Sequence, residues 1–314
     1  MYLSPADYPF SFALKMLRRL LIFMTLIIHI PFQAQTQTNT VAFERFLSVG
    51  DQNGPDFTQT ELSAQAHFNL GFSTMFLATS LGITESSNFT FYPEIGINDD
   101  ALKKVYHVVN KPSFRFDISK NWHFTTQFIS QLSATLTHNL VRDDFFLGGG
   151  LRIGYSWSTE NGTKPSSLVI GTHYDIRTGK PEWLPYLAYR HQLSKQWHVL
   201  LGYPETAIDF RTGRYHIQLK AEHQGSYSNI SDPFEVNGRW AEKILSSQIN
   251  TTLGLGYALG PHWSAQLTLG FAVDPIYQLA DHSNQIVFDY NIDPRPTWAM
   301  GLKYRFNKTK TTAK

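Results

Sequence analysis

The end of this 314-residue chain alternates strictly between two kinds of side chain. Small or charged residues (Ala299, Gly301, Lys303 and Arg305) separate large apolar or aromatic residues (Trp298, Met300, Leu302, Tyr304 and Phe306). Successive side chains of a β-strand point to opposite faces, so a period of two indicates a strand with one apolar and one polar face. The pattern predicts a terminal strand whose two faces meet different surroundings.

The same alternation recurs through the body of the chain, in segments that suit the 9–11 residues of a tilted membrane strand. We predict 14 strands: Val41–Val49, Phe57–Phe68, Thr74–Ile83, Lys104–Ile118, Trp122–Leu136, Phe145–Trp157, Ser166–Arg177, Trp183–Ser194, Trp197–Tyr203, Glu205–Arg211, Arg214–Asn229, Leu245–Leu259, Trp263–Val273 and Trp298–Phe306. An even count requires two short strands that turn at Pro204. Twelve strands is the main alternative. The predicted fold is an all-β, transmembrane, antiparallel up-and-down β-barrel.

The connections fall into two sizes, as in bacterial barrels with short periplasmic turns and long outer loops. Ser119-Lys120-Asn121 exemplifies the short turns, and the predicted long loops are about Glu85–Lys103, Ile230–Glu242 and Asp274–Arg295. Trp122, Trp197 and Trp263 follow short turns directly, and Trp157 precedes one. Tryptophan favours the headgroup level of a bilayer, so these rings predict a periplasmic aromatic girdle.

Alternation alone leaves open whether the apolar face points outward to lipid or inward, as in a soluble carrier. The predicted polar face is mostly Gly, Ser, Thr, Gln and Asn, whereas the surface of a soluble protein carries many Lys and Glu residues. Fourteen strands also enclose more space than side chains fill in a small barrel. We therefore predict a membrane barrel, with a soluble carrier or β-sandwich as the alternative.

A secretory signal precedes the predicted barrel. Basic residues at 15, 18 and 19 lead into an apolar run at Leu20–Phe32, and cleavage is predicted after Ala34. The expected organisation is a signal at 1–34, a periplasmic stub at 35–40, the barrel at 41–306 and a polar tail at 307–314.

Cleavage removes three basic residues and one acidic residue, which leaves 24 of each and no basis for nucleic-acid binding. The chain contains no cysteine, and a hydrogen-bonded barrel needs no disulfides.

Together these features resemble a Bacteroidota-type outer-membrane β-barrel family of unknown function. The resemblance is most specific in Pro185-Tyr186-Leu187-Ala188-Tyr189, in the Tyr203-Pro204 bend and in the ending Lys303-Tyr304-Arg305-Phe306. It implies the fold, the outer membrane of a Gram-negative cell, and contact with membrane lipid. It also implies that the alternating residues Trp298, Met300, Leu302, Tyr304 and Phe306 act as the signal read by the barrel-assembly machinery. It transfers no catalytic residue.

Charged side chains on the predicted polar faces carry the functional hypothesis. The candidates for lining the lumen are Arg115, Asp117, Arg152, Arg190, His198, Lys220, Glu222 and Arg305. Mixed charge inside a barrel either lines a water pore or forms ion pairs that plug it. The leading prediction is a passive channel or small-solute transporter. The rival is a surface-interaction barrel that acts through aromatic residues in its loops, namely Phe89, Phe91, Tyr92, Phe234, Trp240, Tyr277, Phe288 and Tyr290.

A lipid-modifying enzyme that uses His198 or His216 is the third and weakest hypothesis. No G-x-S-x-G, H-E-x-x-H or phosphate-binding loop supports catalysis, so we predict no enzyme activity. The sequence likewise predicts no metal and no cofactor.

Overall fold

The computed structural model describes residues 39–48, 55–87, 101–158 and 165–306, and strands account for most of them. The predicted signal peptide and the polar tail lie outside these residues. The first eight strands are β1 (Asn39–Ser48), β2 (Asp56–Asn69), β3 (Thr74–Ser87), β4 (Lys104–Asp117), β5 (Trp122–Ala134), β6 (Phe145–Ser158), β7 (Pro165–Asp175) and β8 (Glu182–Gln192). The others are β9 (Trp197–Tyr203), β10 (Glu205–Thr212), β11 (Tyr215–Val236), β12 (Arg239–Ala258), β13 (Trp263–Ala280), β14 (Ile286–Asp289) and β15 (Arg295–Phe306). None of the helices in this part of the chain is long and apolar enough to cross a membrane.

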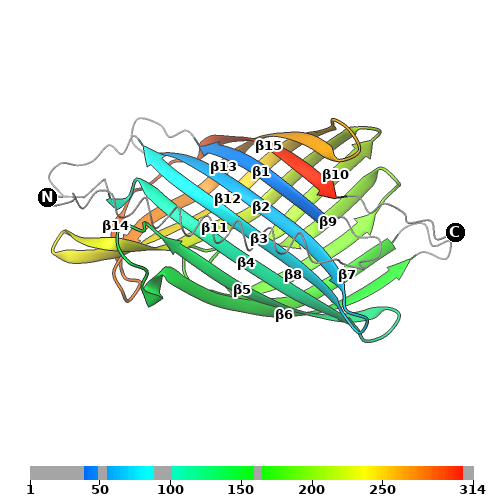
Figure 1. The fold of residues 1–314 in the computed structure, drawn as a ribbon, viewed down its shortest axis with the longest axis horizontal. Helices are drawn as coiled ribbons and strands as arrows, with labels where there is room; N and C mark the ends of the chain where they lie inside the picture. Colours follow the sequence, from blue (N-terminus) through cyan, green and yellow to red (C-terminus); the bar gives the residue numbers. More distant parts are fainter. Residues whose placement is uncertain (1–38, 49–54, 88–100, 159–164, 307–314) are drawn as a thin grey trace, which may run out of the picture.

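The strands close into a barrel in which nearly every strand pairs with its neighbours in sequence (Figure 1). The first strand closes the ring against the last, with Phe43 opposite Leu302 and Leu47 opposite Trp298. Short β14 pairs with β13 above the wall, so the barrel has 14 strands and the 12-strand alternative is wrong. The short pair β9 and β10, separated by Pro204, supplies the two strands that an even count required. Closure leaves the wall without a free edge.

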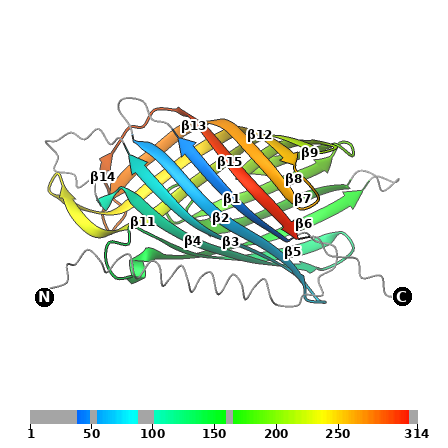
Figure 2. The same ribbon diagram turned by 45° about the horizontal axis from the view of Figure 1, so that its top comes forward.

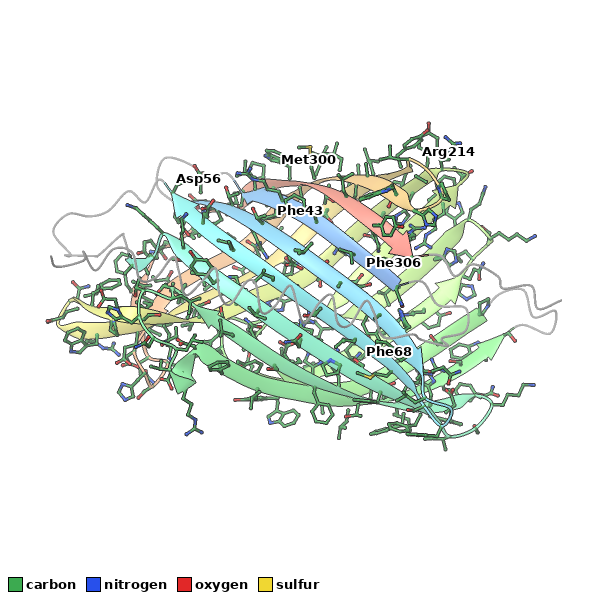
Figure 3. The ribbon with its side chains drawn as sticks, viewed as in Figure 1. Phe43, Asp56, Phe68, Arg214, Met300 and Phe306 are labelled. Atoms are coloured by element: carbon green, nitrogen blue, oxygen red, sulfur yellow. The ribbon has the colours of Figure 1, made fainter. Side chains whose placement is uncertain are left out.

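The alternating pattern separates the two sides of the wall. Along β15, the outward residues Met300 and Leu302 are 56% and 47% exposed, whereas Ala299 between them is 2% exposed. Figure 3 shows Met300 projecting away from the wall, and Leu147 and Leu151 on β6 are similarly exposed. The outer surface of the barrel is therefore apolar, and small or polar residues face the interior. This orientation is opposite to that of a soluble carrier.

Aromatic rings encircle the end of the barrel that carries the short turns. Trp122 packs against Tyr155 in a tilted arrangement with ring centroids 5.0 Å apart, and Trp157 continues the row towards Tyr189. Three further pairs extend it around the wall: Trp197 with Phe210, Tyr215 with Tyr257, and Trp263 with Tyr304. The tryptophans that follow or precede short turns thus form the ring of aromatic residues that the sequence predicted.

The opposite end is built mainly from strand extensions, which corrects two of the predicted long loops. The segment predicted as a loop at Ile230–Glu242 is the tip of a hairpin, in which β11 and β12 continue to a tight turn at Asn237 and Gly238. These residues have φ of 51° and 77°, which suit the two-residue turns that match strand twist. The hairpin, yellow in Figure 1, projects beyond the neighbouring strands. Likewise, β13 continues to Ala280 inside the predicted loop Asp274–Arg295.

One contact joins strands that are far apart around the barrel. The end of β5 meets β11 in parallel at Ala134 and Asn229, and the amide of Thr135 donates to the carbonyl of Asn229 at 3.1 Å. Strands β6 to β10 separate these two in the wall, and β7 to β10 are short. The upper part of β11 therefore leans across the mouth of the barrel. Figure 2 shows the extended β11–β12 hairpin at this end.

Candidate functional site

An apolar cluster lies at the mouth where the β11–β12 hairpin leans over the barrel. We call it the lid; its buried members are Ala101, Leu102, Val105, Ile230, Phe234, Val236, Ala241, Ile244, Tyr277 and Leu279. Phe57, Phe288, Tyr290 and two aliphatic residues pack against it. Phe234 and Tyr277, which the sequence placed in loops, are buried in this cluster, at 8% and 5% exposed. Trp240 stays exposed at 57%, and residues 89, 91 and 92 lie outside the described residues.

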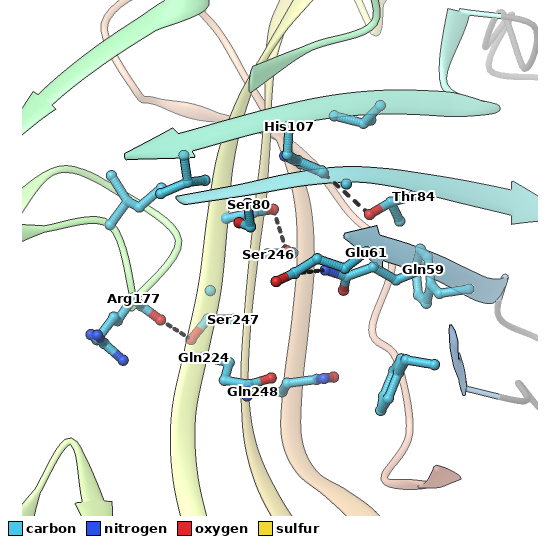
Figure 4. A pocket seen from close by; sticks show the side chains of 18 of the residues that line it. Gln59, Glu61, Ser80, Thr84, His107, Arg177, Gln224, Ser246, Ser247 and Gln248 are labelled. Atoms are coloured by element: carbon cyan, nitrogen blue, oxygen red, sulfur yellow. Dashed lines mark hydrogen bonds between the residues drawn. The ribbon is translucent and has the colours of Figure 1, made fainter. Parts of the chain in front are cut away.

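Beneath the lid is the larger interior cavity, of about 660 Å³. Its wall comes from β1–β5 on one side and β11–β13 on the other, and most of the lining side chains are polar. Figure 4 shows Gln59 bonded to Glu61 and His107 bonded to Thr84, at 3.3 and 3.1 Å. Lys111, Lys220 and Glu222 add charge to the same wall. The cavity thus presents hydrogen-bonding and charged groups, although the lid above it is apolar.

The turn between β7 and β8 packs against β11 and β12 at the boundary of this cavity. The hydroxyl of Ser247 donates to the carbonyl oxygen of Arg177 at 3.1 Å (Figure 4), and the Arg177 guanidinium donates to the carbonyl of His223 at 3.4 Å. Gly225 allows this approach, because a Cβ there would lie 2.2 Å from the Arg177 carbonyl oxygen. The turn is consequently held by two hydrogen bonds between a side chain and a carbonyl, one to β11 and one to β12.

Arg177 also forms the centre of an ion-pair cluster. Its guanidinium lies 2.9 Å from Asp175 and 3.6 Å from Glu222, and Glu222 in turn pairs with Lys220 at 2.8 Å. Asp175, Arg177 and Glu222 line both the larger cavity and a second one of about 180 Å³. The cluster therefore stands between the two compartments of the barrel interior.

The smaller cavity is lined by β5–β11. Its wall includes Gln127, Arg152, His173, Tyr186, Arg190 and Glu205. The Arg152 guanidinium carbon lies 4.3 Å from the centre of the Tyr186 ring, within the usual range of a cation–π contact. The Tyr186 hydroxyl accepts a hydrogen bond from Arg190 at 3.4 Å.

The structure divides the predicted lumen-lining residues into separate groups. Lys220 and Glu222 are paired with each other, and Arg152 and Arg190 both line the smaller cavity. Arg115 and Asp117 form an exposed pair of their own at the short-turn end of β4, with 3.0 Å between N and O. Arg305 lies at the same end on β15. A role for any of them in solute passage stays a prediction.

His198 and His216 face the interior near that end. The imidazole of His216 lies 2.6 Å from Asp209, which also accepts from Gln218, and His198 is opposite Asp209 in the register. Both rings point away from the apolar outer surface, where a lipid substrate would lie. Within the described ranges, no three His, Cys, Asp or Glu side chains are grouped so as to hold a metal ion.

The sequence did not propose His173, Arg177 or Tyr186 as residues of the interior site. His173 and Tyr186 fall on the inward positions of alternating strands, so the period of two could have found them. Arg177 was placed at the end of a strand, and only the packing of the following turn brings it to the centre of the interior.

The fold defines this chain as a closed 14-strand antiparallel barrel with an apolar exterior and polar internal cavities. No family model matches the sequence, and no curated protein matches it either. Solved structures of outer-membrane barrels resemble it at low identity. The CymD monoaromatic hydrocarbon channel has a TM-score of 0.43 at 8% identity, with 87% of this chain and 90% of that chain covered.

Two further structures show the same degree of likeness. An outer-membrane channel from Pseudomonas putida F1 has a TM-score of 0.41 at 9% identity, with 88% and 97% of the two chains covered. The KdgM porin, in complex with disordered oligogalacturonate, has a TM-score of 0.39 at 10% identity, with 85% and 99% covered.

Proposed function

We propose that the protein is a passive channel or small-solute transporter of the outer membrane of a Gram-negative bacterium. The observation that carries the proposal is the combination of an apolar, exposed outer wall with polar cavities of about 660 and 180 Å³ inside it. An apolar surface of this extent is stable in lipid and costs free energy in water. The polar interior offers a solute an environment that the surrounding lipid does not.

The proposed insertion in the outer membrane also specifies the orientation of the barrel, its contact with lipid and its assembly partner. The girdle of aromatic residues at the short-turn end suits the periplasmic headgroup level, and membrane lipid would cover the outer wall. The barrel-assembly machinery is the expected partner during insertion. Membership of the Bacteroidota-type family stays a prediction from the sequence.

Planar-bilayer recording of the purified barrel tests the proposal. We expect discrete conductance steps, and we expect larger steps from a variant in which the apolar lid is opened. A barrel that migrates as folded protein, yet gives no steps in either form, would contradict a channel or transporter function.

One observation favours a second function, that of a surface-interaction barrel. Trp240 is 57% exposed near the tip of the hairpin that projects furthest from the wall, and exposed aromatic residues often mark binding surfaces. A photo-crosslinker incorporated at position 239 in intact cells should capture a surface partner, and Trp240→Ser in that background should abolish capture. Equal capture of the partner with Trp240 present and with Trp240→Ser would reject this function.

A further inference from the structure

We infer that the smaller cavity is a binding subsite for an oxyanion, a carboxylate or phosphate group, held between Arg152 and Arg190. The inference rests on the proposed function and adds to it a chemical class of solute. Four side chains build the subsite: Arg152 on β6, His173 on β7, and Tyr186 and Arg190 on β8.

Strand register explains why Arg152 and Tyr186 meet. Gly171 on β7 lies directly between them, opposite Arg152 on one side and opposite Tyr186 on the other. Because Gly171 has no side chain, the guanidinium and the phenol ring approach each other across it, to 4.3 Å. A Cβ at position 171 would lie 2.9 Å from Cγ of Arg152. The glycine thus makes the space that the Arg152 side chain occupies.

Neither guanidinium group has a carboxylate partner in the described ranges; Arg152 is half-buried, and Arg190 is exposed on the inward face. Within the described residues, no Asp or Glu oxygen lies within 4.0 Å of Arg152 or Arg190. Arg152 is held by the amide oxygen of Gln127 and the Tyr186 ring, and Arg190 by the Tyr186 hydroxyl. These neighbours position the charges without neutralising them.

The acidic residues of the same cavity leave this positive charge in place. Asp175 and Glu222 are engaged by Arg177 and Lys220, at 2.9 and 2.8 Å. Glu205 lines the cavity but forms no ion pair at 4.0 Å or less with the described residues. Two guanidinium groups without a close ion pair in the described part of the chain, beside one such carboxylate, favour an anion over a cation.

Two buried nitrogen atoms point to the same ligand class. Nε of Arg152 and Nε2 of His173 are buried without a hydrogen-bond partner in the part of the chain that the structure describes, and His173 is 3% exposed. A buried polar atom without a partner costs free energy, which a ligand acceptor would recover. The forked N–H groups of arginine match carboxylate and phosphate oxygens in pairs. With His173 in the tautomer that carries its proton on Nε2, an oxyanion in the cavity would satisfy both donors together.

Isothermal titration calorimetry of the full-length barrel in detergent tests the inference without requiring conduction. Inorganic phosphate and acetate are titrated separately at constant ionic strength into wild type, Arg152→Gln, Arg190→Gln and the double variant. We expect wild type to bind at least one of the two anions, and the double variant to bind it about tenfold more weakly or worse, since it loses two charge-assisted contacts. Binding of phosphate alone, acetate alone or both identifies the group that the subsite accepts.

The matched control is Arg115→Gln, which removes an inward arginine that is already paired with Asp117 and should leave binding unchanged. Heat-modifiable migration shows which variants are folded, and Arg190→Gln supplies the comparison if Arg152→Gln does not fold. No binding by wild type, or equal binding by wild type and the Arg190→Gln and double variants, would overturn the subsite. Binding by a barrel that never conducts would instead overturn the proposed function and leave the subsite standing.

Discussion

Glycine residues on the inward face decide which large side chains the barrel interior accommodates. A Cβ at position 150 would lie 2.7 Å from Cβ of His173, and one at position 154 would lie 2.2 Å from Nε2 of His123. Strand interiors usually disfavour glycine, because it packs nothing and loses more chain entropy. Here its absence of a side chain makes room for a histidine or an arginine on the neighbouring strand.

Gly171→Ala should therefore destabilise the barrel by about 1–3 kcal/mol, the usual cost of adding atoms to a tightly packed interior. The new Cβ would lie 2.2 Å from the carbonyl oxygen of Leu151, so main chain must move. Gly260→Ala is the control, since nothing lies within 4 Å of a Cβ at that turn. Urea unfolding in detergent measures both. Equal midpoints for the two variants would contradict this packing account.

Asp281 makes the turn between β13 and β14 sensitive to acid. The amide of Gln285, and then the Arg239 guanidinium, hold the pKa of the Asp281 carboxyl below its usual range. A lowered pKa means that the stabilisation is present above the pKa of the unfolded chain and is lost as pH falls through the folded-state value. We expect the amides of Ser283 and Gln285 to lose hydrogen-exchange protection below about pH 4, near the unfolded-chain value. Asp281→Asn should show weak protection at every pH.

At the scale of elements, the β11–β12 hairpin contributes part of the lid, and two of its rings provide a matched test. Phe234 is 8% exposed inside the lid, whereas Trp240 on the same hairpin is 57% exposed. Phe234→Ser places a polar group in the apolar cluster and should loosen the lid, giving larger or longer-lived conductance steps. Trp240→Ser should leave conductance unchanged. Indistinguishable recordings from the two variants would show that the lid does not control passage.

The terminal strand provides a second element-scale prediction. The ring centroids of Tyr304 and Phe306 are 4.8 Å apart, and Phe306 is 38% exposed on the outer wall. Phe306→Asp should block assembly and leave degraded or periplasmic protein, because it alters the proposed signal and puts a charge on a face where charges cost up to roughly 2–4 kcal/mol. Lys303→Ala, on the inward face, should assemble nearly normally. The amount of heat-modifiable protein in outer-membrane fractions measures both, and the reverse order would invert the face assignment.

Alternation predicted the wall of the barrel because each strand records its two surroundings in its own sequence. The 14 segments, the pair around Pro204 and the outward face of β15 all follow from that local signal. The hairpin tip does not follow from that signal, because Pro233, Asn237 and Gly238 are residues typical of loops. Pairing between β11 and β12 determines that the segment is extended.

For the whole molecule, the period of two indicated which side chains face inward but not which of them meet. Arg152 lies in register with Gly171 and Tyr186, whereas Arg190 lies four positions further along β8 and reaches the same Tyr186 through its hydroxyl. The central position of Arg177 depends on hydrogen bonds from its turn to β11 and β12, between residues 46 and 70 positions apart. The meeting of β11 with β5 likewise joins residues 95 positions apart. No local pattern records such a contact.

The central claim of this account is that lipid covers the outer wall while water reaches the inner face. The chain has no native cysteine, so single cysteines at positions 298 to 303 can be labelled cleanly in reconstituted vesicles. We expect a charged, water-soluble maleimide to modify positions 301 and 303, and a lipid-soluble reagent to modify 298, 300 and 302. Position 299, whose native alanine is 2% exposed, should react with neither. Uniform labelling by the charged reagent, or the opposite alternation, would contradict a membrane barrel with this orientation.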